Sequence, residues 1–154
     1  MSEELLKVQN LKKFFQTPGG SLHAVDDVSF SINEASTLGV VGESGCGKST
    51  LGRTLLRLNE PTSGEIWFHG QDVVKASKRE MSKIRPKMQM IFQDPMASLN
   101  PRKKVEDIIG EGLDIHHMYK TREERREKVE KILAKVGLAP EHAERYPHQF
   151  SGGQ

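Results

Sequence analysis

Apolar and polar residues alternate in the first part of the chain. Val28, Phe30 and Ile32 are separated by two serines, and this period of two predicts a strand with one buried face. Three further short apolar runs are strand-like in composition: residues 38–41, 66–68 and 88–92. We therefore expect the beginning of the chain to be rich in β-structure.

Helical spacing of apolar residues begins after a glycine-rich stretch. Leu51, Leu55 and Leu58 recur every three to four residues, which predicts an amphipathic helix. Residues 77–85 predict a shorter helix that stops at Pro86, because proline cannot continue a helix ladder.

From residue 103 onward the chain is charged and mostly helical in pattern. Thr121, followed three residues later by Glu124, is typical of a capping box. Four apolar residues then predict one buried stripe that ends at Gly137: Val129, Ile132, Leu133 and Val136. We expect a strand-rich part over residues 1–95 and a helical part over residues 96–154.

Composition and charge change this picture little. Of 154 residues, 35% are apolar and 29% are charged, and the net charge is +2, which is ordinary for a globular protein and creates no strong field. The single cysteine, Cys46, excludes an intrachain disulfide. No run of about 18 apolar residues predicts a membrane span. Residues 122–128 mix both signs and predict a solvated helix face, with no nucleic-acid partner.

The glycine-rich stretch carries the clearest chemistry. Residues 42–49 match the pattern G-x-x-x-x-G-K-[ST] in full, in which glycines let the backbone turn its N–H groups toward a phosphate chain. Lys48 is expected to reach the β- and γ-phosphates, Ser49 to bind Mg²⁺ and Thr50 to donate to a phosphate oxygen. The expected nucleotide-binding residues are Gly42, Glu43, Ser44, Gly45, Cys46, Gly47, Lys48, Ser49 and Thr50.

Two later segments narrow the class of phosphate-loop protein. Residues 150–154, Phe-Ser-Gly-Gly-Gln, resemble the signature motif of the ATP-binding cassette family, with phenylalanine in place of the usual leucine, and Lys48 precedes Ser151 by 103 residues. Gln93, after the apolar run 88–92, is similar to the glutamine of the family's Q-loop. The resemblance implies ATP as nucleotide and the α/β fold of P-loop NTPases. Residues 1–95 would form a β segment with the core strand and helix, and residues 96–154 a helical signature subdomain.

The resemblance also implies roles for single residues. Lys48 and Gln93 would act in catalysis, and Gln93 would bind Mg²⁺ or water beside the γ-phosphate. An aromatic residue at Phe15 would stack on adenine, with Phe14 as the competitor and core packing as the alternative for both. The signature residues would bind the γ-phosphate of ATP held by a second ATPase subunit, identical or different: Ser151, Gly152, Gly153 and Gln154.

A narrower resemblance concerns residues 93–102, Gln-Asp-Pro-Met-Ala-Ser-Leu-Asn-Pro-Arg. This segment is similar to that of ATPases from oligopeptide and dipeptide importers, a group that includes nickel and glutathione systems. Met96, Ala97 and Leu99 would then contact transmembrane permease subunits at the cytoplasmic face of the membrane, and a substrate-binding protein would take part indirectly. A buried loop turned by two prolines is the alternative.

The family's next motifs would follow residue 154: the Walker B aspartate, the catalytic glutamate and the switch histidine. A chain limited to residues 1–154 is therefore expected to be inactive in ATP hydrolysis and poorly stable. Two alternatives remain open at this point, a cassette ATPase without a membrane partner and a non-catalytic nucleotide-binding module. The former typically carries insertions or a strongly basic surface, and neither is present here.

Overall fold

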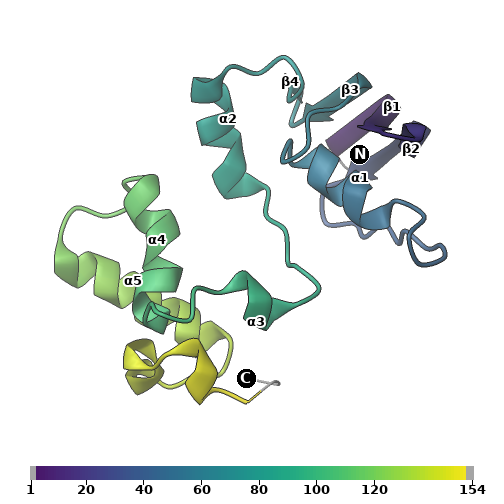
Figure 1. The fold of residues 1–154 in the computed structure, drawn as a ribbon. Coiled ribbons are helices and arrows are strands. Elements are labelled where there is room, and N and C mark those ends of the chain that lie inside the picture. The colour runs from purple at the N-terminus through teal and green to yellow at the C-terminus, as the bar shows by residue number, and fades with distance from the viewer. Residues whose placement is uncertain (1–2, 152–154) are drawn as a thin grey trace. The chain divides into compact units, whose positions relative to one another are not determined.

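The computed structural model describes residues 3–151, except for the side chains of Pro95 and Met96. The chain forms two compact units, one up to Met90 and the other from Ile91 onward. Figure 1 shows a twisted sheet with helices α1 and α2 in the first unit, and helices α3 to α5 in the second. Strand-rich and helical parts therefore follow one another along the chain.

The first unit is built on an antiparallel sheet with the order β2-β1-β3-β4. Its long hairpin pairs Thr17 with Gly20 at the turn and Val8 with Phe30 farther along. The predicted strands around residues 28–32 and 66–68 are confirmed. The strands are β1 (Glu4–Thr17), β2 (Gly20–Asn33), β3 (Ser63–Phe68) and β4 (Gln71–Asp72).

Two helices complete this unit, α1 (Lys48–Leu55) and α2 (Lys78–Ile84). The hydroxyl of Ser77 accepts a hydrogen bond from the Glu80 N–H, and the Glu80 carboxylate accepts one from the Ser77 N–H, at 2.7 Å. This capping box starts α2, and the helix gives way to a 3₁₀ turn, Arg85–Lys87, that contains Pro86. The predicted helix over residues 77–85 is thus confirmed.

One apolar cluster holds the sheet and both helices together. Leu11, Ile66 and Val73 are fully buried at its centre, and α1 contributes Leu51. The remaining buried members come from α2, the strands and the segment between β4 and α2: Leu6, Val8, Val25, Phe68, Ala76, Met81 and Ile84.

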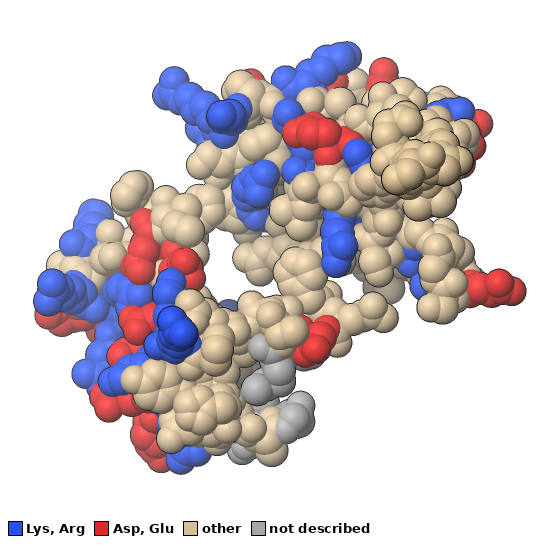
Figure 2. Space-filling view, in the orientation of Figure 1, with Lys and Arg blue, Asp and Glu red and all other residues tan. Residues whose placement is uncertain are grey.

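The second unit has a smaller core. Val129 and Leu133 of α5 and Ala143 are its buried residues, and Figure 2 shows basic and acidic side chains interspersed over the visible face of the unit. The elements are α3 (Pro95–Ser98), α4 (Val105–Ile115), α5 (Arg122–Lys135) and the 3₁₀ turns Pro140–Glu144 and Pro147–Gln149. No helix within residues 3–151 is both long and apolar enough to cross a bilayer.

Two predicted strands are wrong. Residues 38–41 and 88–92 belong to no strand, and Val41 and Ile91 are 94% and 95% exposed. A strand needs a hydrogen-bonding neighbour, and none of the described residues pairs with either run. Their continuous apolar character is typical of strands buried on both faces of a parallel sheet, so composition alone misleads where no neighbour lies alongside.

The helix predictions also need local corrections. Helix α1 ends at Leu55, and Leu58 lies beyond it with its side chain exposed. In α5 only half of the predicted stripe is buried, because Ile132 is 41% and Val136 67% exposed. The core of the unit is too small to cover the whole apolar face of the helix.

The predicted capping box of α5 is only half formed. The hydroxyl of Thr121 accepts a hydrogen bond from the Glu124 N–H at 3.2 Å, as expected. The Glu124 carboxylate accepts instead from the N–H of Lys120, at 2.8 Å. The Thr121 hydroxyl and the Glu124 carboxylate thus still accept hydrogen bonds from backbone N–H groups at the start of the helix.

Candidate nucleotide-binding site

The glycine-rich loop precedes α1 and meets the sheet through Gly47. Gly47 caps the helix in the left-handed region, with φ 96°. A side chain at this position would overlap the backbone carbonyl of Ala24 in β2. Only glycine satisfies both requirements, the positive φ and the close backbone approach. Gly47 therefore fixes the beginning of α1 directly against β2.

The side chain of Lys48 folds back over the loop. Its ammonium donates to the carbonyl oxygens of Gly42 and Glu43, at 2.7 and 2.6 Å, and lies 3.6 Å from Cys46 Sγ. Lys48 takes part in no ion pair within residues 3–151. Its positive charge is therefore solvated by loop carbonyls and not compensated by a carboxylate, which suits an anionic ligand.

The first turn of α1 adds a second attraction for anions. It has no acidic residue and no side-chain cap, so the N–H groups that face out of a helix start have no competing acceptor there. Ser49 is exposed and Thr50 half-buried, as phosphate or Mg²⁺ ligands must be. The donor set of this loop, with an ammonium, backbone N–H groups and a hydroxyl, fits a nucleotide triphosphate with its metal.

Helix α1 is anchored through its other face. Leu51 and Thr54 are buried against the sheet, and the Thr54 hydroxyl donates to the carbonyl of Thr50 at 2.8 Å. The buried hydroxyl is therefore satisfied within the helix. Burial of this face leaves the loop and the first turn free to meet a ligand.

The two phenylalanines of β1 have different surroundings. The ring of Phe14 stacks on His23, with centroids 3.7 Å apart, and the ammonium of Lys13 lies 4.7 Å from the centroid of Phe15. His23 adjoins Ala24, the residue that touches Gly47. Both aromatic residues thus lie in the part of the sheet that supports the loop, and stacking of Phe15 on adenine stays a prediction.

A carboxylate completes this corner of the sheet. His23 Nδ1 lies 3.1 Å from Asp26, and Lys12 Nζ lies 3.2 Å from the other carboxylate oxygen. Hydrogen bonding to His23, and then to Lys12, holds the pKa of Asp26 below its usual value. The carboxylate therefore stays charged and fixes His23 in place against Phe14.

Gln93 belongs to the second unit, where it lies exposed in a bend. Asp94, the next residue, caps α3, because its Oδ1 accepts from the N–H of Ala97 at 3.0 Å. Pro95 occupies the first helical position. Ala97 is exposed and Leu99 half-buried, whereas the side chain of Met96 lies outside the described residues.

The signature residues are described only in part. Phe150 packs edge-on against His142, with centroids 5.6 Å apart, so the phenylalanine in place of leucine serves the second unit's own packing. Ser151 follows with an exposed side chain. Gly152, Gly153 and Gln154 lie outside the described residues. Within residues 3–151 no cluster of His, Cys, Asp and Glu could hold a metal by itself.

Two residues that hold the site in place have no clear signal in the sequence. Ala24 matters through its backbone carbonyl, which no side-chain pattern reveals. Arg57 donates hydrogen bonds to Glu60 and to two carbonyls beyond β4. The one feature of the sequence that could have drawn attention to Arg57 is its position between the predicted amphipathic helix and Pro61.

Comparison with known proteins agrees with this geometry. The profile of the family described as ABC transporter matches residues 25–154. The chain belongs to this ABC transporter family. The predicted family is thereby confirmed.

Two similar relatives of this ABC transporter chain are named as oligopeptide transport proteins. It is 57% identical to the oligopeptide transport ATP-binding protein OppF of Bacillus subtilis over 155 residues, covering all of the chain and 51% of that protein. It is 53% identical to the oligopeptide transport ATP-binding protein AppF of the same organism, covering 99% of the chain and 48% of that protein. The chain thus spans about half the length of the curated relatives it matches.

Solved ATP-binding cassettes share its fold, which confirms the predicted fold class. The dimeric structure of the ATP-binding cassette MJ0796 bound to ADP and Pi has a TM-score of 0.82 and 26% identity, covering 97% of this chain and 65% of that one. CbiO1 from Clostridium perfringens, part of the transporter complex cbiONQ, has a TM-score of 0.77 and 26% identity, covering 99% and 57%.

Proposed function

We propose that this chain is the ATP-binding part of the ATPase subunit of an importer for oligopeptides or dipeptides. The subunit couples ATP binding and hydrolysis to transport. The identity with the two Bacillus subtilis peptide-transport proteins supports the peptide class. Nickel and glutathione remain alternative cargoes, because the segment over residues 93–102 is common to those systems.

The loop geometry carries the nucleotide-binding part of this proposal. Within residues 3–151 the Lys48 ammonium has only neutral acceptors, and the β- and γ-phosphates replace them with full negative charge. The first turn of α1 receives the phosphates through its N–H groups, and Thr50 donates to a phosphate oxygen. Ser49 and Gln93 supply oxygen ligands for Mg²⁺, which neutralises charge on the phosphates when it is bound.

The complete site is shared between two subunits. Ser151 and residues 152–154 bind the γ-phosphate of ATP held by the partner ATPase subunit, so that two nucleotides lie between two chains. The solved dimer of MJ0796 with ADP and Pi supports this arrangement. The dimer lies at the cytoplasmic face of the membrane, held there by permease subunits, and a substrate-binding protein delivers the cargo to those subunits.

A nucleotide titration of Lys48→Ala tests the site. Loss of the ammonium removes a charge-assisted contact, so we expect the Kd for ATP to rise by about 100-fold, on the order of 3 kcal/mol. Arg53→Ala is the matched control, because it removes one positive charge from the exposed face of the same helix. Equal Kd values for Lys48→Ala and the wild type would show that phosphate is bound elsewhere.

Peptide uptake by cells tests coupling. In the intact subunit, Gln93→Ala should keep ATP binding but lower hydrolysis-driven uptake of a labelled peptide, because Gln93 senses the γ-phosphate without holding the nucleotide. A parallel loss of ATP affinity and uptake would contradict this role.

A further inference from the structure

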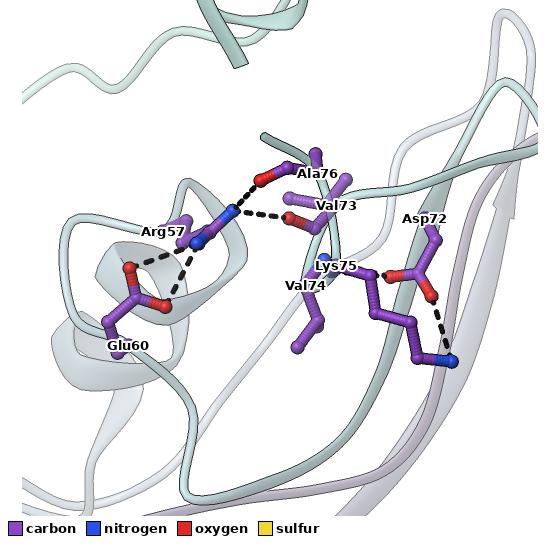
Figure 3. Close-up of polar contacts among 7 residues, drawn as sticks. All are labelled: Arg57, Glu60, Asp72, Val73, Val74, Lys75 and Ala76. Atoms are coloured by element: carbon purple, nitrogen blue, oxygen red, sulfur yellow. Dashed lines mark hydrogen bonds and ion pairs between the residues drawn. The ribbon is translucent and has the colours of Figure 1, made fainter. Parts of the chain in front are cut away.

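The residue that follows the end of α1 makes an unusual set of contacts. Arg57 lies two positions beyond Leu55, and its side chain is only 22% exposed. Its Nε donates to both carboxylate oxygens of Glu60, at 2.9 and 3.0 Å. Its Nη1 donates to the carbonyls of Val73 and Ala76, at 3.1 and 2.6 Å. Figure 3 shows the guanidinium between these two groups of acceptors.

The two carbonyl acceptors, Val73 and Ala76, belong to the turn over residues 72–76, which has its own hydrogen bonds. Asp72 Oδ1 accepts from the N–H groups of Val74 and Lys75, at 2.9 and 3.0 Å, and Lys75 Nζ lies 3.3 Å from the other oxygen (Figure 3). The N–H of Val73 donates to Ile66 of β3 at 2.8 Å, and the Val73 side chain is fully buried. Arg57 therefore ties α1 to a point fixed on the sheet.

The backbone of Arg57 adopts a conformation that favours glycine. Its φ is 51°, in the left-handed region that glycine adopts freely after a helix and that other residues adopt at a cost. The contacts of the guanidinium offset this cost. Lysine could not replace them, because a single ammonium lacks the planar fork that serves a carboxylate and two carbonyls together.

Both ends of α1 are thus held against the sheet. Gly47 touches Ala24 at the beginning of the helix, and Arg57 is bound to the 72–76 turn after its end. An eight-residue helix is only about 12 Å long, so a shift at one end tilts the other. The direction of its first N–H groups, which receive the phosphates, depends on the axis.

We propose that Arg57 is a positioning residue for nucleotide binding, which sets the orientation of α1 and so of its phosphate-binding first turn. This inference rests on the proposed function. Arg57 follows the end of α1, opposite to the first turn that receives the phosphates, and it acts through the helix. Its loss should therefore weaken binding of the phosphates and leave binding of the nucleoside unaffected.

Calorimetric titration of the Arg57→Lys variant tests this role. The variant is titrated with ATP directly, and its affinity for adenosine is measured by displacement of one ligand by the other. Lysine keeps the charge and the aliphatic stem, so the variant should fold. We expect the Kd for ATP to rise about tenfold, with unchanged stoichiometry and an unchanged Kd for adenosine. Arg53→Lys makes the same exchange on the exposed face of α1 and should change neither value.

Arg57→Gly provides a second variant, because glycine accepts the positive φ while removing every side-chain contact. It should weaken ATP binding at least as much as Arg57→Lys. A merely structural role would lower the stoichiometry for both ligands and leave each Kd unchanged, and that result overturns the inference. Wild-type affinity for ATP in either variant also overturns it, while the proposed function stands. Failure of the wild type to bind ATP would overturn the proposed function itself.

Discussion

The two units differ in what lies against a glycine of a packed helix. In the first unit, Gly47 at the start of α1 meets the backbone carbonyl of Ala24. In the second unit, Gly110 of α4 meets the guanidinium of Arg125, a side chain of α5 that pairs with Asp114 at 2.7 and 2.9 Å. A backbone carbonyl in a sheet cannot move aside, whereas a guanidinium can rotate away.

This difference bears on function. Phosphate binding needs fixed donors, because preorganised N–H groups lose no free energy in reorganising around the ligand. The first unit provides them by backbone contact and by a large core. The second unit, with three buried core residues among those described and an ion pair between its helices, is held by groups that can adjust. We therefore expect substitutions at close contacts in the first unit to impair nucleotide binding more than substitutions at close contacts in the second unit.

The largest effect is expected for Gly47→Ala. The new methyl group would overlap the carbonyl of Ala24, and alanine at φ 96° adds backbone strain of about 1–3 kcal/mol. ATP binding should fall below detection in a titration. Gly39→Ala is the control, because no atom lies within 4 Å of the added group. Retained binding in Gly47→Ala would mean that the contact between loop and sheet is dispensable.

Leu133→Ala should have the next largest effect, in the second unit. Removing this buried side chain should cost about 2–5 kcal/mol, whereas its exposed neighbour Ile132 should cost under about 1 kcal/mol when replaced by alanine. Hydrogen exchange should show lost protection in α4 and α5 and unchanged protection in β1 to β3. Equal loss in the sheet would show that the two units unfold together.

Gly110→Ala should have a small net effect. The methyl group displaces the guanidinium of Arg125 from Asp114, but alanine also favours the helix by about 1 kcal/mol relative to glycine. Gly112 lies on the same helix with open space around it. Gly112→Ala should therefore show only the gain in stability from the higher helix propensity of alanine. The difference between their unfolding midpoints measures the ion pair and should shrink with added salt. If the difference does not change with salt concentration, packing and not the ion pair causes it.

The smallest effect concerns pH and the turn that receives Arg57. Burial works to raise the pKa of Asp72, but hydrogen bonds from Lys75 and Val74 outweigh it and lower the pKa below 3.8. The charged carboxylate therefore stabilises the fold above pH 3.8, and this contribution is lost as the pH falls through the lowered pKa. In thermal melts between pH 7 and pH 3, Asp72→Asn should lose less stability on acidification than the wild type. Parallel curves would exclude Asp72 as a source of acid sensitivity.

Much of the fold could be predicted wherever the signal is local. The alternation at Val28, Phe30 and Ile32 and the cap at Ser77 report backbone preferences of a few adjacent residues, and both elements form as expected. Residues 38–41 and 88–92 were predicted as strands for the same kind of reason. They are not, since strand formation depends on neighbours that a local pattern does not report.

The candidate site divides in the same way. Residues 42–50 were predicted from a contiguous motif, and the structure brings the loop, the Lys48 side chain and the start of α1 together. Phe15 and Gln93 came from resemblance, and their roles stay predictions. Ala24 and Arg57 could not be predicted, because the first acts through its backbone and the second through acceptors 16 and 19 residues away.

The sequence by itself determined the chemistry of the loop, because glycines, a lysine and a serine at fixed spacing leave few other uses. Together with Gln93 and residues 150–154, it also determined the family. Only the tertiary structure decided how that loop is held. It placed Gly47 against Ala24 and joined the end of α1 to the 72–76 turn through Arg57. Such contacts form between backbone atoms that are far apart in the sequence and that the sheet brings together. A local sequence pattern does not report which distant backbone atoms will meet.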